Sequence, residues 1–183
     1  MTTHSVLFRQ EPVWQENRIG TRHRLPETVQ SWTYESGSLT QRLRAVYGND
    51  VAVNVLFQDW RVPFLSERRL LKLPERRLCL VREVLLHADG KPLILARTII
   101  PTATIKIASS LAHLGTRPLG EVIFSYSKLE RIAMDVTLIK ASIWTSSTLH
   151  NADIQQPIWG RRTVYAIKHR PMLVSEFFLP EIL

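Results

Sequence analysis

The fold is decided by one stretch of the sequence, LCLVREVLLHADGKPLILARTII, which spans residues 78–100. Two mostly apolar runs, residues 78–86 and residues 93–100, lie on either side of Asp89-Gly90. An Asp-Gly pair is typical of the two-residue turn that joins antiparallel strands. The stretch therefore predicts a β-hairpin. Pro101 ends it, because proline cannot donate a hydrogen bond to a strand ladder.

Two arginines interrupt the apolar faces of this hairpin. Residues two apart in a strand point to the same side, so Arg82 shares a face with Leu80 and Val84, and Arg97 shares a face with leucines and isoleucines. Counting back from a two-residue turn places Arg82 directly opposite Arg97 on one face. Like charges in that position destabilise a sheet. The sequence therefore predicts a carboxylate or an anionic ligand between the two arginines.

A last hairpin supplies the candidate carboxylate. Its strands are predicted at residues 161–167 and 172–179, and Glu176 shares a face with Val174 and Phe178. Two interpretations remain open: Glu176 neutralises an arginine in the core, or it lies in an arginine-lined pocket for a small organic acid. Glu83 faces the other way and is expected to pair with another buried or edge cation. Arg161 and Arg162, at the start of a strand, are expected to be solvated.

The remaining elements indicate the fold class. Further strands are predicted at residues 51–62 and 129–143. Helices are predicted from a Ser38 cap to a Gly48 stop, through Ile107 to Leu114, and from Pro118 through Phe124. Residues 146–157 are polar and are expected to form a loop. Because the strands are grouped, we expect an α+β fold with a mostly antiparallel sheet.

The composition suits a single domain over residues 1–183. The chain has 183 residues, of which 45% are hydrophobic, and a formal net charge of +8. A basic balance favours nucleic acid, a membrane surface or an acidic small molecule as partner, although a solvated basic surface is an alternative. The basic residues are spread along the chain, so we expect no nucleic-acid partner.

The composition also disfavours disulfide-bonded, metal-binding, secreted and membrane-spanning proteins. The single cysteine, Cys79, lies in an apolar run and is expected to be a buried, inert thiol. The histidines show no metal-ligand spacing, so no metal is expected. The start of the sequence, residues 1–5, lacks the apolar core of a signal peptide, and no apolar run approaches the ~20 residues of a membrane span. We therefore expect a cytoplasmic monomer that is not inserted in a membrane.

No known catalytic signature is present. The sequence contains no G-x-S-x-G, no P-loop and no G-x-G-x-x-G after a strand. This absence favours a chemistry that needs no nucleophile, metal or cofactor.

Several segments are similar to those of the chorismate pyruvate-lyase family, also called 4-hydroxybenzoate synthase. The similar segments, in chain order, are LVREVLL at 80–86 with ADG at 88–90, ARTIIP at 96–101, LGTRPLG at 114–120, WGRR at 159–162 and LVSEFFLP at 173–180. Their order and most of their spacings fit the family. Together they cover the chain well from about residue 78 to residue 180.

The resemblance implies an antiparallel sheet with a buried ligand pocket under helical flaps. It implies conversion of chorismate to 4-hydroxybenzoate and pyruvate, without a cofactor, as the first committed step toward ubiquinone, and retention of the product. It makes Glu176 and Arg82 the catalytic residues and also substrate-binding residues, with Leu39, Arg97 and Leu119 as further substrate contacts.

The alternative is the small-molecule-sensing domain of bacterial transcription regulators, which has a similar fold. Such a domain normally follows a DNA-binding helix-turn-helix. We expect too little chain before residue 78 to hold that module and the rest of the sheet.

Overall fold

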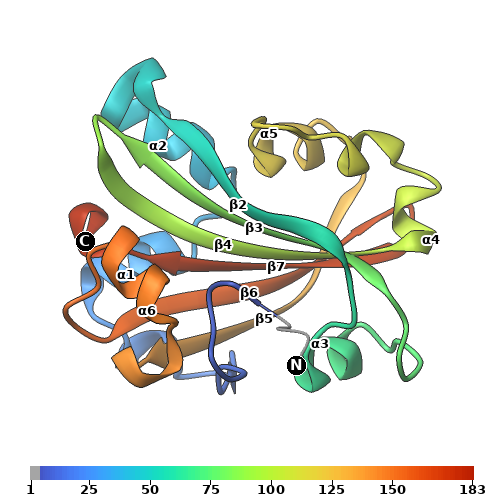
Figure 1. Cartoon of the computed structure of the whole chain (residues 1–183), viewed down its shortest axis with the longest axis horizontal. Coiled ribbons are helices and arrows are strands. Elements are labelled where there is room, and N and C mark those ends of the chain that lie inside the picture. The colour runs from blue at the N-terminus through green and yellow to red at the C-terminus, as the bar shows by residue number, and fades with distance from the viewer. Residues whose placement is uncertain (1–4) are drawn as a thin grey trace.

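The fold is built on one antiparallel sheet. The computed structural model describes residues 5–183 and shows a seven-stranded sheet of order β1-β5-β6-β7-β4-β3-β2 (Figure 1). The expectation about a signal peptide concerns residues 1–4 in part, which lie outside the described residues. The strands are β1 (Gln15–Glu16), β2 (Ala52–Arg61), β3 (Cys79–Ala88), β4 (Lys91–Pro101), β5 (Leu129–Ile139), β6 (Ile158–Ile167) and β7 (Arg170–Phe178).

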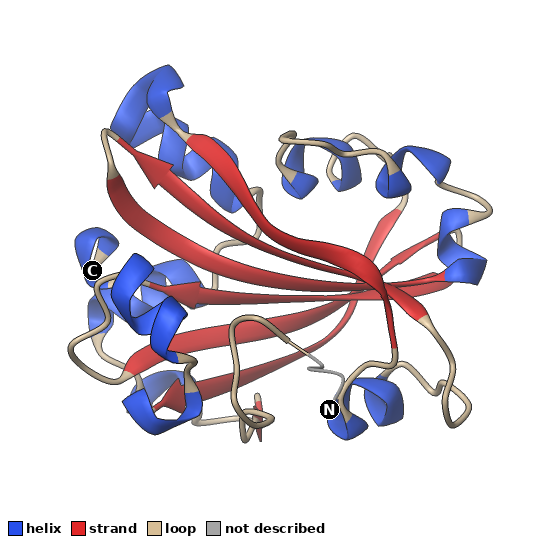
Figure 2. Cartoon of the chain, in the orientation of Figure 1, coloured by secondary structure: helices blue, strands red, loops and turns tan. Residues whose placement is uncertain are grey.

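Short helices lie on both faces of this sheet (Figure 2). The face that α2 and α5 cover is called the pocket face below, and the face that α3 and α6 cover is called the back face. The α-helices are α1 (Glu27–Thr33), α2 (Leu39–Tyr47), α3 (Leu65–Leu70), α4 (Thr102–Ile105), α5 (Leu119–Ile123) and α6 (Ser146–Asn151). The predicted α+β class with a mostly antiparallel sheet is confirmed.

The predicted central hairpin is confirmed, but its register is not. Asp89 and Gly90 both have positive φ, at 50° and 74°, and Ala88 pairs with Lys91 as a two-residue turn requires. Beyond the turn the register shifts by one residue, since His87 pairs with Pro92 but Leu86 pairs with Ile94. A bulge is favourable here because Pro92 has no N–H to donate to the ladder.

This bulge reverses the face of every later residue in β4. Arg82 lies opposite Thr98, and Arg97 lies opposite Glu83. The predicted juxtaposition of Arg82 and Arg97 on one face is therefore wrong: Arg82 belongs to the pocket face and Arg97 to the back face. A one-residue slip is enough, because side chains alternate between the two faces of a strand.

Three predicted elements differ in extent. The helix expected from Ile107 to Leu114 is replaced by α4 and a separate 3₁₀ turn at Ser109–Ala112. The strand predicted at 129–143 ends at Ile139. The loop predicted at 146–157 begins with α6, whose first turn is capped by Thr145, because its hydroxyl accepts a hydrogen bond from the Thr148 amide at 3.2 Å. The helix α1 was not predicted.

Cys79 is fully buried, as predicted. Burial, with a smaller contribution from the charge of Glu67, raises the pKa of its thiol to about 11. We expect iodoacetamide to alkylate the native protein near pH 7 at least about a hundredfold more slowly than the urea-unfolded chain, because the thiolate is the reactive form. Mass spectrometry measures both rates. Labelling of the native protein at the unfolded rate would contradict this assignment.

Candidate functional site

The candidate site is a pocket between the sheet and the helices α2 and α5. Its walls come from β2, β3, β4, β6 and β7 on the sheet side and from both helices on the other side. Most of its lining is apolar, and the lining residues are Leu39, Thr40, Val53, Arg82, Val84, Leu86, Ile94, Ala96, Thr98, Pro118, Leu119, Gly120, Ile123, Phe124, Tyr165, Val174 and Glu176. Four of the five predicted site residues line it: Leu39, Arg82, Leu119 and Glu176.

The two covering helices contact each other directly. Gly120, on α5, approaches Ser38 so closely that an added Cβ would lie 2.6 Å from the Ser38 hydroxyl oxygen, so any larger residue here would force Ser38 to shift. Arg44 on α2 also forms an ion pair with Glu121 on α5. Because Leu39 begins α2 and Leu119 begins α5, these contacts hold two apolar side chains over the pocket.

Arg82 is one of the two charged residues that line the pocket. Its side chain is buried, with 2% of the residue exposed. Its Nη1 donates hydrogen bonds to Oε1 of Gln58 and to the carbonyl of Gly115, each at 2.9 Å, and its Nη2 donates to the carbonyl of Arg117 at 3.3 Å. None of these acceptors is charged, and Arg82 has no ion pair within residues 5–183. Burial accordingly lowers the pKa of the Arg82 guanidinium.

The hydrogen bonds of Arg82 leave one edge of its guanidinium unused. A guanidinium carries five N–H donors, and three of them are engaged, two on Nη1 and one on Nη2. Among residues 5–183, Nε has no hydrogen-bond partner and Nη2 has only one, and these two nitrogens form one edge of the guanidinium. That edge matches the two oxygens of a carboxylate, which arginine binds through parallel hydrogen bonds. The pocket therefore presents a pre-oriented anion-binding group.

Glu176 is the second charged group that lines the pocket, and its partner is Arg161. The two residues lie opposite each other in the β6–β7 hairpin, and Arg161 Nε donates to Glu176 Oε2 at 2.8 Å. Arg161 Nη1 also donates to the carbonyls of Thr33 and Glu35, at 3.0 and 2.9 Å. The side chain of Arg161 is only 1% exposed, so the prediction that it is solvated is wrong.

Counting residues back from the β6–β7 turn would have predicted the pairing of Arg161 with Glu176. Lys168 and His169 both have positive φ and form a two-residue turn that pairs Ile167 with Arg170. The same count places Arg161 opposite Glu176. Of the two interpretations that the sequence left open, both hold in part: Glu176 pairs with a buried arginine, which is neither Arg82 nor Arg97, and it also lines the pocket.

One oxygen of Glu176 stays available. Oε2 accepts from Arg161, whereas Oε1 has no hydrogen-bond partner among the described residues, and 16% of the side chain is exposed. Tyr165, which sequence reasoning did not single out, adds an aromatic wall beside it. Its hydroxyl accepts a hydrogen bond from Arg131 at 3.0 Å, and burial raises the pKa of its phenol. Oε1 is therefore the carboxylate oxygen that can accept a hydrogen bond from a ligand.

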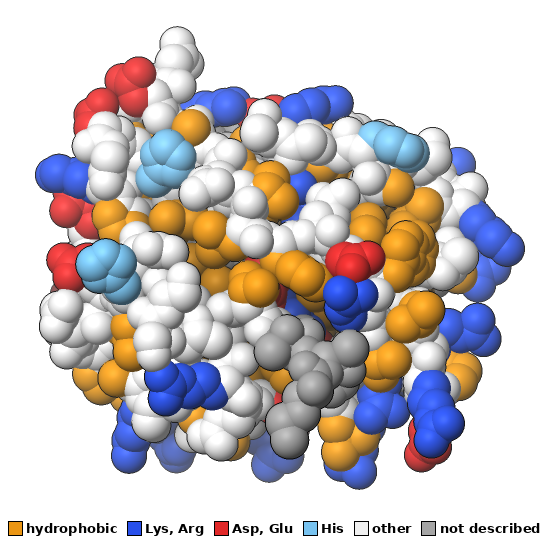
Figure 3. All heavy atoms as spheres, in the orientation of Figure 1, with side chains coloured by type: hydrophobic (Ala, Val, Ile, Leu, Met, Phe, Trp, Pro, Cys, Tyr) orange, Lys and Arg blue, Asp and Glu red, His pale blue; other side chains and the backbone are white. Residues whose placement is uncertain are grey.

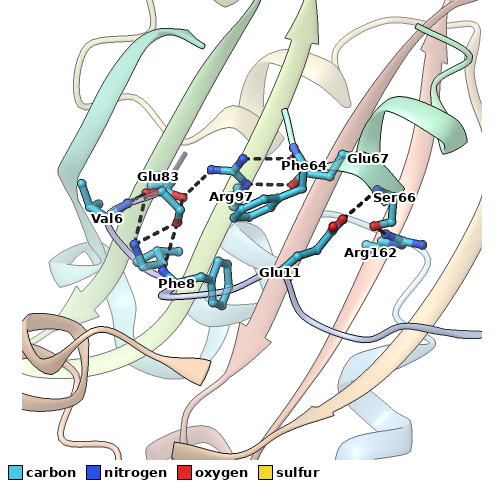
Figure 4. Close-up of polar contacts among 11 residues, drawn as sticks. Val6, Phe8, Glu11, Phe64, Ser66, Glu67, Glu83, Arg97 and Arg162 are labelled. Atoms are coloured by element: carbon cyan, nitrogen blue, oxygen red, sulfur yellow. Dashed lines mark hydrogen bonds and ion pairs between the residues drawn. The ribbon is translucent and has the colours of Figure 1, made fainter. Parts of the chain in front are cut away.

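Arg97, the fifth predicted site residue, lies on the back face (Figure 4). Its Nε and Nη2 donate to the two oxygens of Glu67, at 2.8 and 3.0 Å, and its Nη1 donates to Glu83 at 2.6 Å. Glu83 also accepts from the backbone amide of Val6 at 2.7 Å. This network binds α3 and the N-terminal segment to the sheet. Arg97 does not line the pocket, whereas the predicted pairing of Glu83 with a buried cation is confirmed.

Arg162, like Arg97, is paired with a carboxylate on the back face. It follows Arg161 in β6 and therefore points to the back face, where its Nε donates to Asp135 at 2.7 Å. Its Nη1 donates to the Ser66 hydroxyl at 2.7 Å, as Figure 4 shows. The predicted solvation of Arg162 is wrong for the same reason as that of Arg161.

Comparison with known proteins identifies the family. A family model described as chorismate lyase matches residues 9–183. The chain belongs to the chorismate lyase family. A relative from Methylococcus capsulatus, named "Probable chorismate pyruvate-lyase", is 44% identical over 85% of this chain and 96% of its own. A relative of the same name from Thiobacillus denitrificans is 36% identical over 86% of each chain. The chorismate lyase match thus extends well before residue 78.

Solved structures share the fold at low identity. The C-terminal domain of PhnF matches with a TM-score of 0.58 and 13% identity, over 81% of this chain and 91% of that domain. A transcriptional regulator of the GntR family from Bacillus cereus matches with a TM-score of 0.56 and 15% identity, over 74% of this chain and 95% of that chain. At this identity the likeness concerns the fold alone.

Residues 5–183 contain no group of three or more His, Cys, Asp or Glu side chains placed to hold a metal ion. In the same residues, no helix is both long and apolar enough to span a membrane. On the face drawn in Figure 3, Lys and Arg side chains are scattered, mostly along the rim, and separated by uncharged groups.

Proposed function

We propose that this protein is a chorismate pyruvate-lyase, which converts chorismate to 4-hydroxybenzoate and pyruvate. The observation that carries the proposal is the unused edge of the buried Arg82, in a largely apolar pocket that also presents a carboxylate oxygen of Glu176. The relatives that span most of the chain carry the same activity in their names. The likeness to transcription regulators rests on 15% identity or less, so the alternative of a ligand-sensing domain is not favoured.

The proposed reaction needs only small changes in bonding. The ether bond between the ring and the enolpyruvyl group breaks, and the ring loses the hydrogen beside it as a proton. The enolpyruvyl fragment leaves as the enolate of pyruvate and takes up one proton on its methylene carbon, which balances the proton lost by the ring, and the ring becomes aromatic. No electrons are exchanged with another compound. Because aromatisation makes the step strongly downhill, the protein mainly has to bind the substrate in a reactive shape and exclude water.

The pocket has a shape that suits the product. In 4-hydroxybenzoate the carboxylate and the hydroxyl lie at opposite ends of a flat ring. Arg82 and Glu176 lie on strands two apart in the sheet, β3 and β7, and are offset by two residues through Ala96 and Thr98 of β4. Since adjacent strands are about 4.8 Å apart, the two backbones are separated by roughly 10 Å across the sheet. The side chains can therefore reach the two ends of one ring.

We assign a role to each of these side chains. Arg82 binds the ring carboxylate through Nε and Nη2, and Leu39 and Leu119 cover the ring. Glu176 accepts a hydrogen bond from the 4-hydroxyl through Oε1. Arg161 holds the other oxygen of Glu176, which orients this acceptor. Arg97 has no role in binding, because its guanidinium is paired with two carboxylates on the back face.

The experiment that tests the proposal is a product assay. Purified protein is incubated with chorismate in EDTA, and 4-hydroxybenzoate and pyruvate are both quantified. The expected result is one pyruvate for each 4-hydroxybenzoate, at a rate far above spontaneous decay. Loss of activity in EDTA that a divalent cation restores would contradict the proposal, and so would the absence of turnover. Since one chain supplies all the assigned residues, we further propose a single-domain monomer, which size-exclusion chromatography with light scattering tests.

Product inhibition is expected from the same geometry. 4-Hydroxybenzoate keeps the ring carboxylate for Arg82 and the hydroxyl for Glu176, so the reaction leaves these contacts intact. We expect added 4-hydroxybenzoate to slow the initial rate. More chorismate should relieve this inhibition, because the two compounds compete for the pocket. Full progress curves measure both effects. Curves that remain unchanged with 4-hydroxybenzoate present would show that the product does not occupy this pocket.

A further inference from the structure

Gln58 contacts the guanidinium of Arg82 from the edge strand β2. Along this strand, Val53 pairs with Leu86 and Val55 with Val84, so both face the pocket side. The register then shifts by one residue between Val55 and Phe57. The bulge moves Gln58 onto the pocket face, directly opposite Arg82, where simple alternation would have placed Phe57.

The amide of Gln58 is oriented by two hydrogen bonds. Its Oε1 accepts from Arg82 Nη1 at 2.9 Å, and its Nε2 donates to the carbonyl of Ala112 at 3.5 Å. The carbonyls of Gly115 and Arg117 complete the set of acceptors. Together these groups fix the plane of the guanidinium and direct its Nε–Nη2 edge away from them.

The partners of Arg82 differ from those of the other buried arginines in charge. Four arginines are buried in the described part of the chain: Arg82, Arg97, Arg161 and Arg162. Every one except Arg82 forms an ion pair with a glutamate or aspartate. Arg82 alone among them is oriented entirely by neutral acceptors. Its charge is therefore left for a ligand.

We propose that Gln58 determines the specificity of the pocket for carboxylate ligands, because it orients Arg82 without neutralising it. This inference rests on the proposed function, in which the pocket takes 4-hydroxybenzoate. Gln58 acts through Arg82 and is a positioning residue. It is also the one side chain among the acceptors of Arg82, since the others are backbone carbonyls. A single substitution can thus change the charge of this acceptor set.

Gln58→Glu is the informative substitution, because glutamate has nearly the same shape and can accept the same hydrogen bond. A carboxylate at this position would form an ion pair with Arg82, and a ligand carboxylate would then meet a neutral pair. Gln58 is exposed, although its amide contacts the buried Arg82, so solvent weakens the effect. We expect the affinity for 4-hydroxybenzoate to fall by roughly threefold to tenfold. The affinity for 4-hydroxybenzamide, a neutral analogue of the same shape, should change little.

The experiment is calorimetric titration of both ligands into wild-type protein, Gln58→Glu and Gln58→Met, with a thermal scan of each. Gln58→Met removes the acceptor without adding charge. It should weaken the binding of 4-hydroxybenzoate less than Gln58→Glu does. Asn54→Asp is the matched control, because it adds one negative charge to an exposed position of the same strand. It should leave the preference for the acid over the amide unchanged. The melting temperature of Gln58→Glu should equal or exceed that of wild type.

Two results would overturn the inference. In the first, Gln58→Glu binds 4-hydroxybenzoate as tightly as wild type. In the second, its affinities for 4-hydroxybenzoate and for 4-hydroxybenzamide fall by the same factor. The second result would show that Gln58 only maintains the shape of the pocket. If the wild-type protein itself binds no 4-hydroxybenzoate, the proposed function fails and this inference fails with it. The wild-type titration therefore distinguishes the two failures.

Discussion

Replacing Arg82 with methionine is expected to lower kcat/KM for chorismate by roughly 30-fold to 5,000-fold while the protein stays folded. Loss of a buried charged contact to a ligand weakens binding by roughly 2–5 kcal/mol, which corresponds to that range of rates. The effect on stability should be small, because two changes oppose each other. Three hydrogen bonds to neutral acceptors are lost, but a buried charge without an ion pair is removed.

Arg97→Met is the matched control for this prediction. Arg97 lies on the adjacent strand and is equally buried, but it is paired with Glu67 and Glu83. Its removal would leave two carboxylates buried without a cation, which destabilises by about 3–5 kcal/mol. Urea denaturation and steady-state assays of both variants measure the contrast. The assignment is contradicted if Arg97→Met is as stable as wild type, or if Arg82→Met keeps its activity.

Replacing Glu176 with alanine is expected to reduce both stability and turnover. Arg161 is fully buried and Glu176 is its carboxylate partner, so truncation leaves an unpaired charge and destabilises by about 3–5 kcal/mol. For a chain of this length, that loss lowers Tm by roughly 6–20 °C. Turnover should also fall, because Oε1 no longer accepts from the 4-hydroxyl. Glu176→Gln keeps an acceptor for Arg161, so it should be more stable than Glu176→Ala while remaining slower than wild type.

A double-mutant cycle separates the two roles of Glu176. Adding Arg161→Met to Glu176→Ala removes the orphaned charge and should restore most of the lost stability. It should not restore turnover, since the acceptor in the pocket is still absent. Thermal scans and the chorismate assay give the two readouts. Recovery of activity in the double variant would show that Glu176 acts only as the counterion of Arg161, and full activity of Glu176→Gln would show that its negative charge is not needed.

The sequence alone predicts the two hairpins and the apolar faces, because turn residues and alternation are local signals. Asp89-Gly90 predicted the central turn, and the alternation around Arg82 and Glu176 placed both on the face that lines the pocket. The resemblance to a family added the helical side of the site, where Leu39 and Leu119 begin α2 and α5. These four residues line the pocket, and the prediction of each one depended on few steps.

The errors in assigning residues to a face of the sheet arose at β-bulges, where the register shifts by one residue. The bulge after Pro92 moved Arg97 to the back face, and the bulge before Phe57 placed Gln58 on the pocket face, opposite Arg82. A bulge adds one residue to one strand, and nothing in simple alternation reveals it. The partner of Glu176 was missed for a different reason: the register of the β6–β7 hairpin was not counted. Register, more than strand location, therefore limited the prediction of this site.

The most direct test of the central claim is the crystal structure of the protein with 4-hydroxybenzoate bound. The claim is that the free edge of Arg82 binds the ring carboxylate, in a pocket that α2 and α5 cover. The structure should show both carboxylate oxygens within hydrogen-bond distance of Arg82 Nε and Nη2. The ligand hydroxyl should donate a hydrogen bond to Oε1 of Glu176. The ring should lie under Leu39 and Leu119. A ligand that leaves the Arg82 edge empty, or that binds outside this pocket, would contradict the account.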